Sequence, residues 1–258
     1  TSMIIMNYSQ KYSNLIFCRT DKKGPSAARN IGLKNAKCEY TFFIDGDVKL
    51  EAGFIDHALN EFQSHEQTCA IAGVLSDVVY NSTNDKIIAY IKDRYNRQVR
   101  KNVDRFGGIF IVRSSIACRV GLWDEMLFSH EDTDYAVRLK EFGNLVALPH
   151  KMGDHHTSLY EDRMLRMLRS GYFASYGIFM RKYYGKPIVA YKFASKMSFM
   201  YPITLLVTLY LTTFIIPIAS YFMLLVILVD IGLAIKEGKS LISRMLAHYV
   251  APFQVLYG

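Results

Sequence analysis

The chain has 258 residues, which is enough for one full domain and an appendage. Its 31 Lys and Arg residues exceed its 23 Asp and Glu residues, giving a net charge of +8, and 51% of the chain is hydrophobic, which suggests membrane contact. The four cysteines lie far apart and form no C-x-x-C pair, which argues against a zinc site and indicates reduced thiols in a cytosolic environment.

Strands and helices are predicted to alternate up to residue 158. Residues 15–19 are predicted to be a strand, Pro25 opens a helix that ends near Asn35, and the aromatic run 40–44 is a buried strand. The series continues with helix 52–62, strand 69–79, a polar segment of helix and loops at 81–104, strand 107–112, helix 132–142 and strand 144–148. This order predicts an α/β domain with a mainly parallel, Rossmann-like sheet and sites at the C-terminal ends of strands.

The first acidic motif follows strand 40–44. Asp45 and Asp47 are separated by one residue, and side chains two apart in an extended segment point the same way, so both carboxylates are expected to converge on one spot. Carboxylates at the end of a strand suit Mg²⁺ or Mn²⁺ that carries phosphate oxygens. The alternative is a solvated acidic turn.

The second acidic motif opens the helix in FSHEDTDYAVRLKEFG. Glu131 and Asp132, together with Asp45 and Asp47, predict a metal-assisted group transfer with a separate carboxylate base. Taken alone, the segment 129–132 is instead a capping box, in which Asp132 serves only the helix terminus.

Three segments resemble the GT-A glycosyltransferases of family 2: GPSAARNIGL, FFIDGD and GGIFIVRSSIACRVGLWDEMLFSHEDTDYAVRLKEFG. The resemblance covers about residues 14–186 and implies a GT-A-like fold, a nucleotide-sugar donor, Mn²⁺ or Mg²⁺, and inversion at the anomeric carbon. It implies that Asp47 holds the metal, that Asp45 contacts the donor and that Asp132 is the general base beside Glu131. The opening segments of the family, which hold the nucleotide base, find no counterpart here, so the domain is expected to lack its N-terminal part.

The same resemblance suggests further residues around the donor. The segment HHTS matches a family segment with a metal-ligating histidine, so His155 and His156 are candidate metal ligands or else surface histidines. Arg29 and Asn30, in the ARN-x-G segment, either brace the donor pocket or cap and pair locally.

The acceptor is expected near three other features. Trp123 in GLWDE is predicted to line the acceptor pocket, either by packing in its wall or by stacking on a sugar, and the compatible alternative is a plain core residue. Gly107 and Gly108 are predicted to lie at the acceptor as well. The polar segment 81–104 is expected close to the acceptor. Because the sequence contains no Q-x-x-R-W motif of processive synthases, transfer of a single sugar is predicted.

The C-terminal part is basic and then apolar. No acidic residue occurs between Asp162 and Asp230, and basic residues are frequent over 163–196. The stretch 197–235 is too long for one crossing of a bilayer core of about 30 Å, and Pro217 near its middle predicts a transmembrane helical hairpin. Basic clusters flank the stretch at both ends, and they would keep both ends of the hairpin in the cytoplasm. The alternative is a pair of buried helices in a soluble protein.

These predictions define four parts: a GT-A-like catalytic domain at 1–158, basic juxtamembrane helices at 159–196, the transmembrane hairpin at 197–235 and an interfacial amphipathic helix at 236–258. Anionic lipids are the expected partner of the basic segment, because it borders the apolar stretch, and no nucleic acid partner is expected.

The predicted function is an inverting, metal-dependent glycosyltransferase at the cytoplasmic membrane face. It would move one sugar from a nucleotide-sugar to a lipid-linked or saccharide acceptor. The alternative is a non-catalytic, membrane-bound partner of a complete glycosyltransferase. The missing opening segments favour that alternative, and the presence of Asp45, Asp47 and Asp132 opposes it.

Overall fold

The computed structural model describes residues 2–22, 24–81, 83, 86–158, 167, 169–170, 172, 174–189, 207, 210, 225–229 and 231–232. The chain divides into two compact units. The first unit comprises Thr1–Ser76, Asp93–Glu125 and Glu131–His155, and the second comprises Asp77–Lys92, Met126–His130 and His156–Gly258. The boundary expected at residue 158 stays a prediction.

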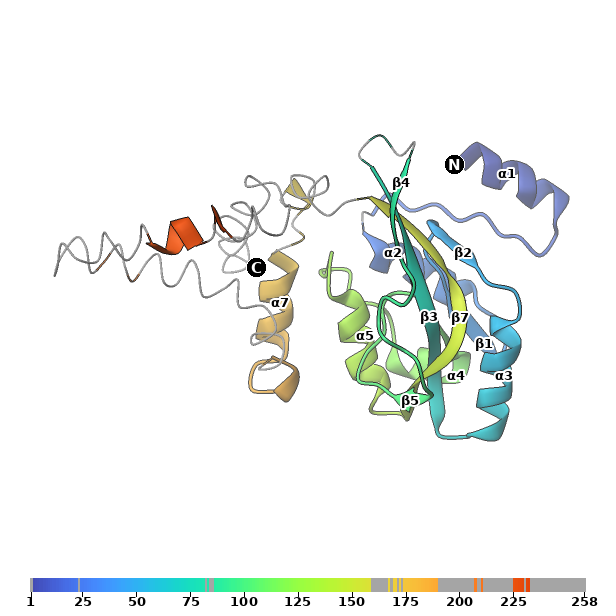
Figure 1. Cartoon of the computed structure of the whole chain (residues 1–258). Helices are drawn as coiled ribbons and strands as arrows, with labels where there is room; N and C mark the ends of the chain where they lie inside the picture. The colour runs from blue at the N-terminus through green and yellow to red at the C-terminus, as the bar shows by residue number, and fades with distance from the viewer. Residues whose placement is uncertain are drawn as a thin grey trace. The chain divides into compact units, whose positions relative to one another are not determined.

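Figure 1 labels the helices and strands in chain order. The elements are α1 (Ser2–Lys11), α2 (Pro25–Asn35), β1 (Tyr40–Phe43), β2 (Val48–Leu50), α3 (Phe54–Ser64), β3 (Thr68–Tyr80), β4 (Ile87–Ile91), β5 (Lys101–Asn102), β6 (Phe110–Arg113), α4 (Ser114–Val120), α5 (Glu131–Leu139), β7 (Asn144–Ser158) and α7 (Ala174–Lys182). The α/β class predicted from the sequence is confirmed, and α2, β1, α3, β3 and α5 lie within a few residues of their predicted bounds.

The sheet differs from the mainly parallel one that was predicted. Its strand order is β1-β6-β3-β7-β2, with β5 paired to β7 and with β4 paired to the end of β3 inside the second unit. The pairs β1/β6, β3/β6, β3/β4, β5/β7 and β2/β7 are all antiparallel. Parallel pairing needs a crossover between two strands, and the expected first strand at 15–19 is irregular, so α2 is not preceded by a strand that β1 could pair with.

Two further predictions of secondary structure are corrected. The polar segment 81–104 contains the short strands β4 and β5 in place of a helix. The last strand runs on from residue 148 to Ser158, although Pro149 and Gly153 would normally end it. This extension is possible because β2 pairs with it, Val48 lying opposite His155.

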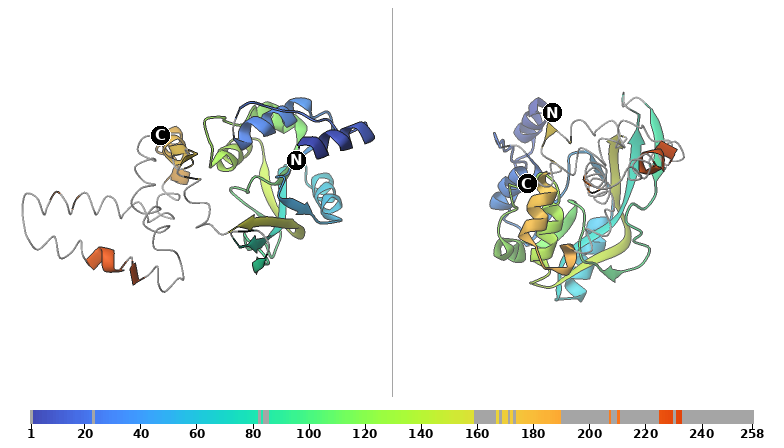
Figure 2. Two further views of the ribbon diagram at one scale, coloured as in Figure 1. Left: turned by 90° about the horizontal axis from the view of Figure 1, so that it is seen from above. Right: turned by 90° about the vertical axis from the view of Figure 1, so that its left-hand side faces the viewer.

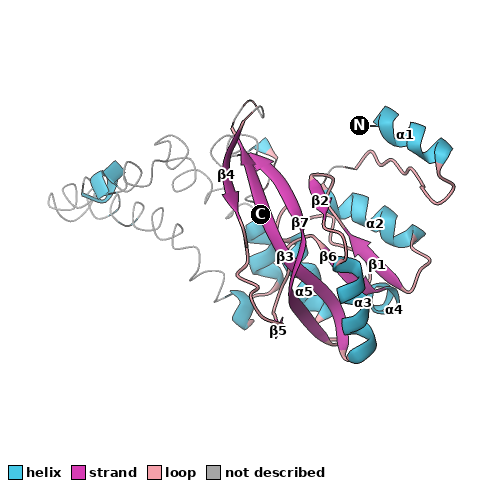
Figure 3. Cartoon of the chain, turned by 45° about the vertical axis from the view of Figure 1, so that its right-hand side comes forward, coloured by secondary structure: helices cyan, strands magenta, loops and turns pink. Residues whose placement is uncertain are grey.

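Strand β1 alternates its aromatic side chains between the two faces of the sheet. Tyr40 stacks on Phe62 of α3 at 4.7 Å, whereas Phe43 packs edge-on against Tyr135 of α5 and Trp123. Helices α3 and α5 accordingly lie on opposite sides of the central strands in Figures 1 and 3. The two-residue period of a strand thus forms a core on both faces. Figure 2 shows the same helices and strands from above and from the side.

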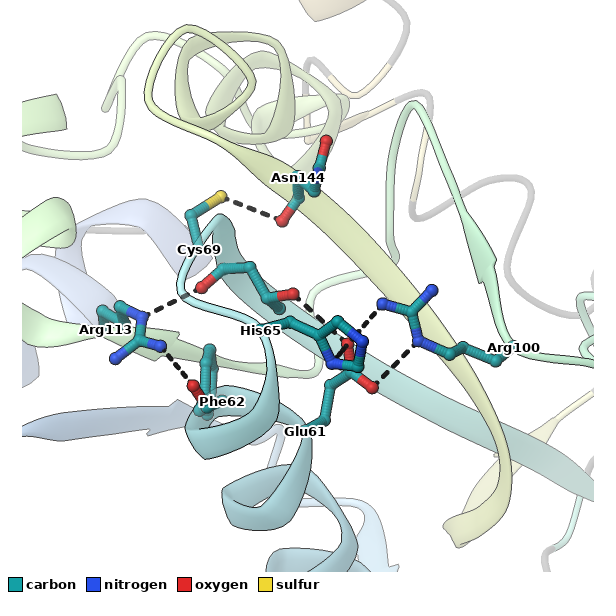
Figure 4. Close-up of polar contacts among 8 residues, drawn as sticks. Glu61, Phe62, His65, Cys69, Arg100, Arg113 and Asn144 are labelled. Atoms are coloured by element: carbon teal, nitrogen blue, oxygen red, sulfur yellow. Dashed lines mark hydrogen bonds and ion pairs between the residues drawn. The ribbon is translucent and has the colours of Figure 1, made fainter.

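Polar contacts fix α3 to the strands around it, as Figure 4 shows. Arg100 donates to both carboxylate oxygens of Glu61 at 2.9 and 2.6 Å, and Thr68 donates to the same group at 3.2 Å. A cavity of about 320 Å³ beside this cluster is lined by Glu61, Arg100 and the stacked imidazoles of His57 and His150, among other residues. Glu61, which lines this cavity, pairs with Arg100 and His65. We therefore interpret the cavity as part of the packing between α3 and its neighbours and not as a binding site.

Glu61→Gln is expected to lower the free energy of unfolding by about 1–2 kcal/mol at pH 7. The expected loss is no larger because Arg100 is partly exposed and solvent screens the ion pair. Burial alone would raise the pKa of Glu61, but the hydrogen bonds and charge of Arg100 outweigh it and lower the pKa. The ionised group therefore stabilises the fold above its unfolded pKa, and this stabilisation is lost as pH falls through the lower folded value. Urea denaturation of the wild type and of Glu61→Gln should show a smaller difference in the free energy of unfolding near pH 3 than at pH 7.

Exposed Glu66→Gln is the control. An equal loss of stability in that variant would contradict the stabilising role assigned to Glu61.

In the second unit, α7 contacts the segment 126–130. The amide of Phe128 donates to Oγ of Ser175 at 2.8 Å, and Oγ of Ser129 donates to the carbonyl of Tyr172 at 2.7 Å. His130, which adopts a φ of 64°, packs against Tyr176 with ring centres 4.8 Å apart. These contacts join the segment 126–130 to α7 and the residues just before it within the second unit.

The predicted hairpin at 197–235 and the interfacial helix at 236–258 fall almost wholly outside the described residues. Within 197–235 the structure describes residues 207, 210, 225–229 and 231–232 alone. In the described part of the chain, none of the helices combines the length and the apolar character needed to span a bilayer.

Candidate functional site

Arg29 of α2 joins the two acidic motifs. Its Nη2 donates to Oδ1 of Asp45 at 2.7 Å, and its Nη1 donates to Oε1 of Glu131 at 2.9 Å. Its side chain is only 9% exposed, and the guanidinium lies 4.7 Å from the ring centre of Trp123. Burial would lower the pKa of Arg29, but the two carboxylates raise it, so the side chain stays charged. Asp45, two residues after the end of β1, and Glu131, the first residue of α5, are therefore held together by one cation.

Gly108 leaves the space that this guanidinium occupies. A methyl group at Gly108 would overlap Nη2 of Arg29 and lie 3.4 Å from Oδ2 of Asp45. A methyl group at the neighbouring Gly107 would lie 2.5 Å from the hydroxyl of Tyr95. Gly108 thus lies beside the Arg29–Asp45 pair and Gly107 beside Tyr95, and the acceptor role of both glycines stays a prediction.

Glu131 and Asp132 differ in their surroundings although they are adjacent. Burial and the charge of Asp132 raise the pKa of Glu131, and Arg29 partly opposes this. Oδ1 of Asp132 accepts a hydrogen bond from the amide of Thr133 at 2.6 Å, and Asp132 is partly exposed. Glu131 is thus committed to Arg29, whereas Asp132 is partly exposed and its Oδ1 bonds to the adjacent Thr133.

Asp45 and Asp47 do not converge as the sequence predicted. Strand β1 ends at Phe43, and the amide of Val48 donates to the carbonyl of Asp45, so the two aspartates lie in a turn. Side chains two residues apart in a turn need not share a face. Asp45 pairs with Arg29, while Oδ2 of Asp47 lies 3.5 Å from Nε2 of His155.

The two candidate histidines point to different neighbours, as expected for consecutive residues of a strand. His155 lies between Asp47 and Arg94, whose Nη1 is 3.4 Å from its Nδ1. His156, in the second unit, lies 3.0 Å from the hydroxyl of Tyr80. His155 is therefore the better candidate for a ligand beside Asp47. No cluster of three or more His, Cys, Asp or Glu side chains suited to a metal occurs among the residues that the structure describes.

A carboxylate oxygen and an imidazole nitrogen 3.5 Å apart are donors that a Mn²⁺ or Mg²⁺ ion accepts. The β2/β7 pairing holds both, since Val48 follows Asp47 and lies opposite His155. The residues present fit such an ion as two of its ligands, and the remaining positions suit oxygens from a substrate.

Asn30 and Trp123 are core residues of the first unit, each 2% exposed. Asn30 donates to the carbonyl of Trp123 at 3.0 Å and accepts from its amide at 2.7 Å, so it joins α2 to a segment 93 residues further along the chain. Its role at the donor pocket stays a prediction. Trp123 stacks on Tyr135 with ring centres 4.1 Å apart. Stacking of Trp123 on a sugar is excluded, because its ring is buried and lies against Arg29, as the core alternative expects. Its place in the wall of an acceptor pocket stays a prediction.

The sequence did not single out Arg94 or Tyr95. Arg94 reaches His155, and the hydroxyl of Tyr95 lies over Gly107. The available signal was the richness in Arg, Asn and Tyr of segment 81–104, which was assigned to the acceptor side without any named residue. Neither residue lies within a recognisable motif, so only the three-dimensional arrangement identifies them.

Comparison with known proteins gives three findings. Residues 1–126 match the model of the family described as "Glycosyl transferase family 2". The minor teichoic acid biosynthesis protein GgaB of Bacillus subtilis (strain 168) is 33% identical over 75 residues, which are 29% of this chain and 8% of GgaB. S. aureus TarS 1–349 in complex with UDP has a TM-score of 0.48 and 18% identity, over 66% of this chain and 51% of that one. The match therefore spans only a small part of GgaB and about half of the TarS fragment.

Proposed function

Residues 1–126 belong to glycosyl transferase family 2, and from this premise we propose that the chain transfers one sugar, with inversion, from a nucleotide-sugar to an acceptor. The observation that carries the proposal is the Asp45–Arg29–Glu131 network. It holds the turn after β1 and the start of α5 at one place, so that donor contacts and a base can face the same anomeric carbon. Binding of a nucleotide-sugar without any turnover would favour the non-catalytic alternative.

In the proposed reaction Asp132 accepts the proton of the acceptor hydroxyl. Loss of that proton makes the oxygen a better nucleophile as it attacks the anomeric carbon, and the bond to the nucleoside diphosphate breaks on the opposite face. Glu131 is unsuited to this task, because Arg29 engages its carboxylate at 2.9 Å. We assign Glu131 to positioning Arg29, and through Arg29 also Asp45, which would contact the donor.

Asp47 and His155 would hold Mn²⁺ or Mg²⁺, with diphosphate oxygens as further ligands. When bound, the metal would offset the charge that develops on the leaving nucleoside diphosphate. His156 is a weaker candidate than His155, because it contacts Tyr80.

Asp47→Ala is expected to abolish metal-dependent binding of a nucleotide-sugar without unfolding the chain, because 55% of the Asp47 side chain is exposed. Calorimetric titration of the purified chain with donor, with and without Mn²⁺, measures this. Asp56→Ala removes an exposed carboxylate from α3 and serves as the control. Unchanged metal-dependent affinity in Asp47→Ala would remove Asp47 from the site.

We propose a lipid-linked or saccharide acceptor. GgaB is named as a protein of minor teichoic acid biosynthesis, and the family match together with this relative supports a glycan as the product. The acceptor's proximity to a membrane rests on the sequence, namely the basic stretch 163–196 and the apolar stretch 197–235. The choice between a hydroxyl and a phosphate as the accepting group is testable through Asp132.

We propose further that the 197–235 stretch is a hairpin with both ends in the cytoplasm. Cysteines placed at residues 192 and 240, before and after the stretch, should both resist labelling by an impermeant maleimide in intact cells and both react after lysis. Labelling of one of them from outside would indicate a single crossing and contradict the hairpin. Exposed Cys18, Cys38 and Cys118 are changed to Ser beforehand.

A further inference from the structure

The segment 93–98 forms a tightly bonded turn in the first unit. The carboxylate of Asp93 accepts hydrogen bonds from the amide of Tyr95 at 3.2 Å, from the amide of Arg97 at 2.7 Å and from Nε2 of Gln98 at 2.7 Å. Asn96 adopts a φ of 51°, a conformation that Asn tolerates better than most residues. The turn is fixed through main-chain groups of Tyr95, so its ring is presented by a rigid backbone.

That ring lies between the two halves of the site. A methyl group at Gly107 would lie 2.5 Å from the Tyr95 hydroxyl, and Gly108, the next residue, contacts the Arg29–Asp45 pair. The guanidinium of Arg94 lies 5.7 Å from the ring centre of Tyr95, and its Nη1 lies 3.4 Å from Nδ1 of His155. Tyr95 therefore connects the donor-binding pair with the candidate metal ligand.

Arg97 supports the ring from the core side. It is 3% exposed, its guanidinium lies 4.4 Å from the ring centre of Tyr95, and its Nη1 donates to the carbonyl of Gly73. Tyr95 itself keeps 40% of its surface exposed. A buried cation beside an aromatic ring stabilises the position of that ring.

We propose that Tyr95 is the platform on which a sugar ring lies during transfer. This inference rests on the proposed function, since it assigns a substrate group to the same site. A sugar presents an apolar C–H face that packs on an aromatic ring and hydroxyls that bond to a phenol, and tyrosine offers both in one side chain. The sugar belongs either to the donor or to the acceptor, and the two are separable by experiment.

Tyr95→Ala is expected to weaken binding of the ligand that carries this sugar by about 3- to 10-fold, the usual worth of an aromatic contact. Calorimetry with a nucleotide-sugar, with the matching nucleoside diphosphate and with acceptor glycan gives three affinities. A loss for the nucleotide-sugar alone assigns the ring to the donor sugar, and a loss for the glycan alone assigns it to the acceptor. An equal loss for the nucleoside diphosphate, or no loss for any ligand, would overturn the proposal.

Two matched variants complete the test. Tyr95→Phe keeps the ring and should retain most of the affinity, whereas Tyr184→Ala removes a highly exposed tyrosine from the second unit and should change nothing. Gly107→Ala forces the Tyr95 hydroxyl to move and should act in the same direction as Tyr95→Ala. Lack of turnover in the wild-type chain would count against the proposed function, whereas the binding measurements judge Tyr95 independently of turnover.

Discussion

Gly108→Ala is expected to lower kcat/KM on the order of 10²-fold, the cost of a displacement of about 1 Å in a site that depends on orientation. The added methyl group would overlap Nη2 of Arg29 and lie 3.0 Å from its Cζ. The guanidinium is the free end of a flexible side chain, so it can move aside, but it then leaves the Asp45 oxygen that it contacts at 2.7 Å. The melting temperature should change little. Steady-state kinetics together with thermal melts measure both quantities.

Gly32→Ala is the matched control for this prediction. Gly32 lies in α2, the same helix as Arg29, and a methyl group there has no atom within 4 Å. Alanine is the better helix former, so this variant should be as active as the wild type and slightly more stable. A Gly108→Ala variant with normal kcat/KM would mean that the Asp45–Arg29 pair can be displaced without consequence, which would remove the main support for the proposed function.

Arg29→Lys gives a second view of the same network. Lysine keeps the positive charge but carries one nitrogen in place of the two that contact Asp45 and Glu131 separately. The shape of the guanidinium, rather than its charge alone, holds two acidic motifs that are 86 residues apart in the chain, from Asp45 to Glu131.

The periodic parts of the fold were predictable from the sequence because one side-chain pattern determines each of them. Tyr40, Phe42 and Phe43 indicate a strand buried on both faces, and both faces are packed. Strand β2 has only three residues and α4 only seven, so neither is long enough to show a period. Strand direction was not predictable in the same way, because β6 pairs with β1 across about 70 residues and no local pattern records that pairing.

The acidic residues of the site were predictable by type, but their partners were not. Asp45 and Asp47 were identified from their place after an apolar strand, yet the turn between them sends one to Arg29 and the other to His155. Trp123 was predicted to pack in a pocket wall or to stack on a sugar, and its burial in the core excludes the stacking. No sequence pattern identifies Tyr95. Its position depends on the hydrogen bond between its amide and Asp93, and on the absence of a side chain at Gly107, which leaves room for its hydroxyl.

Asp132→Asn is expected to reduce turnover by about 10²–10⁴-fold, the usual contribution of a general base. The substitution removes the basic oxygen but preserves the helix start, because Asn can accept the Thr133 amide hydrogen bond that Oδ1 of Asp132 now accepts at 2.6 Å. Donor affinity and the melting temperature should therefore change little. Single-turnover kinetics with saturating donor isolate the chemical step from binding.

Comparison with Glu131→Gln distinguishes the general base, Asp132, from Glu131, which positions Arg29. Arg29 donates to Oε1 of Glu131, and Gln can still accept that hydrogen bond, although without a charge. This variant should affect donor affinity as well as turnover, whereas Asp132→Asn should affect turnover alone. Near-normal turnover in Asp132→Asn with a hydroxyl acceptor would reduce Asp132 to a helix cap. Near-normal turnover only with a phosphate acceptor would have another cause, because an acceptor that is already ionised has no proton for Asp132 to remove.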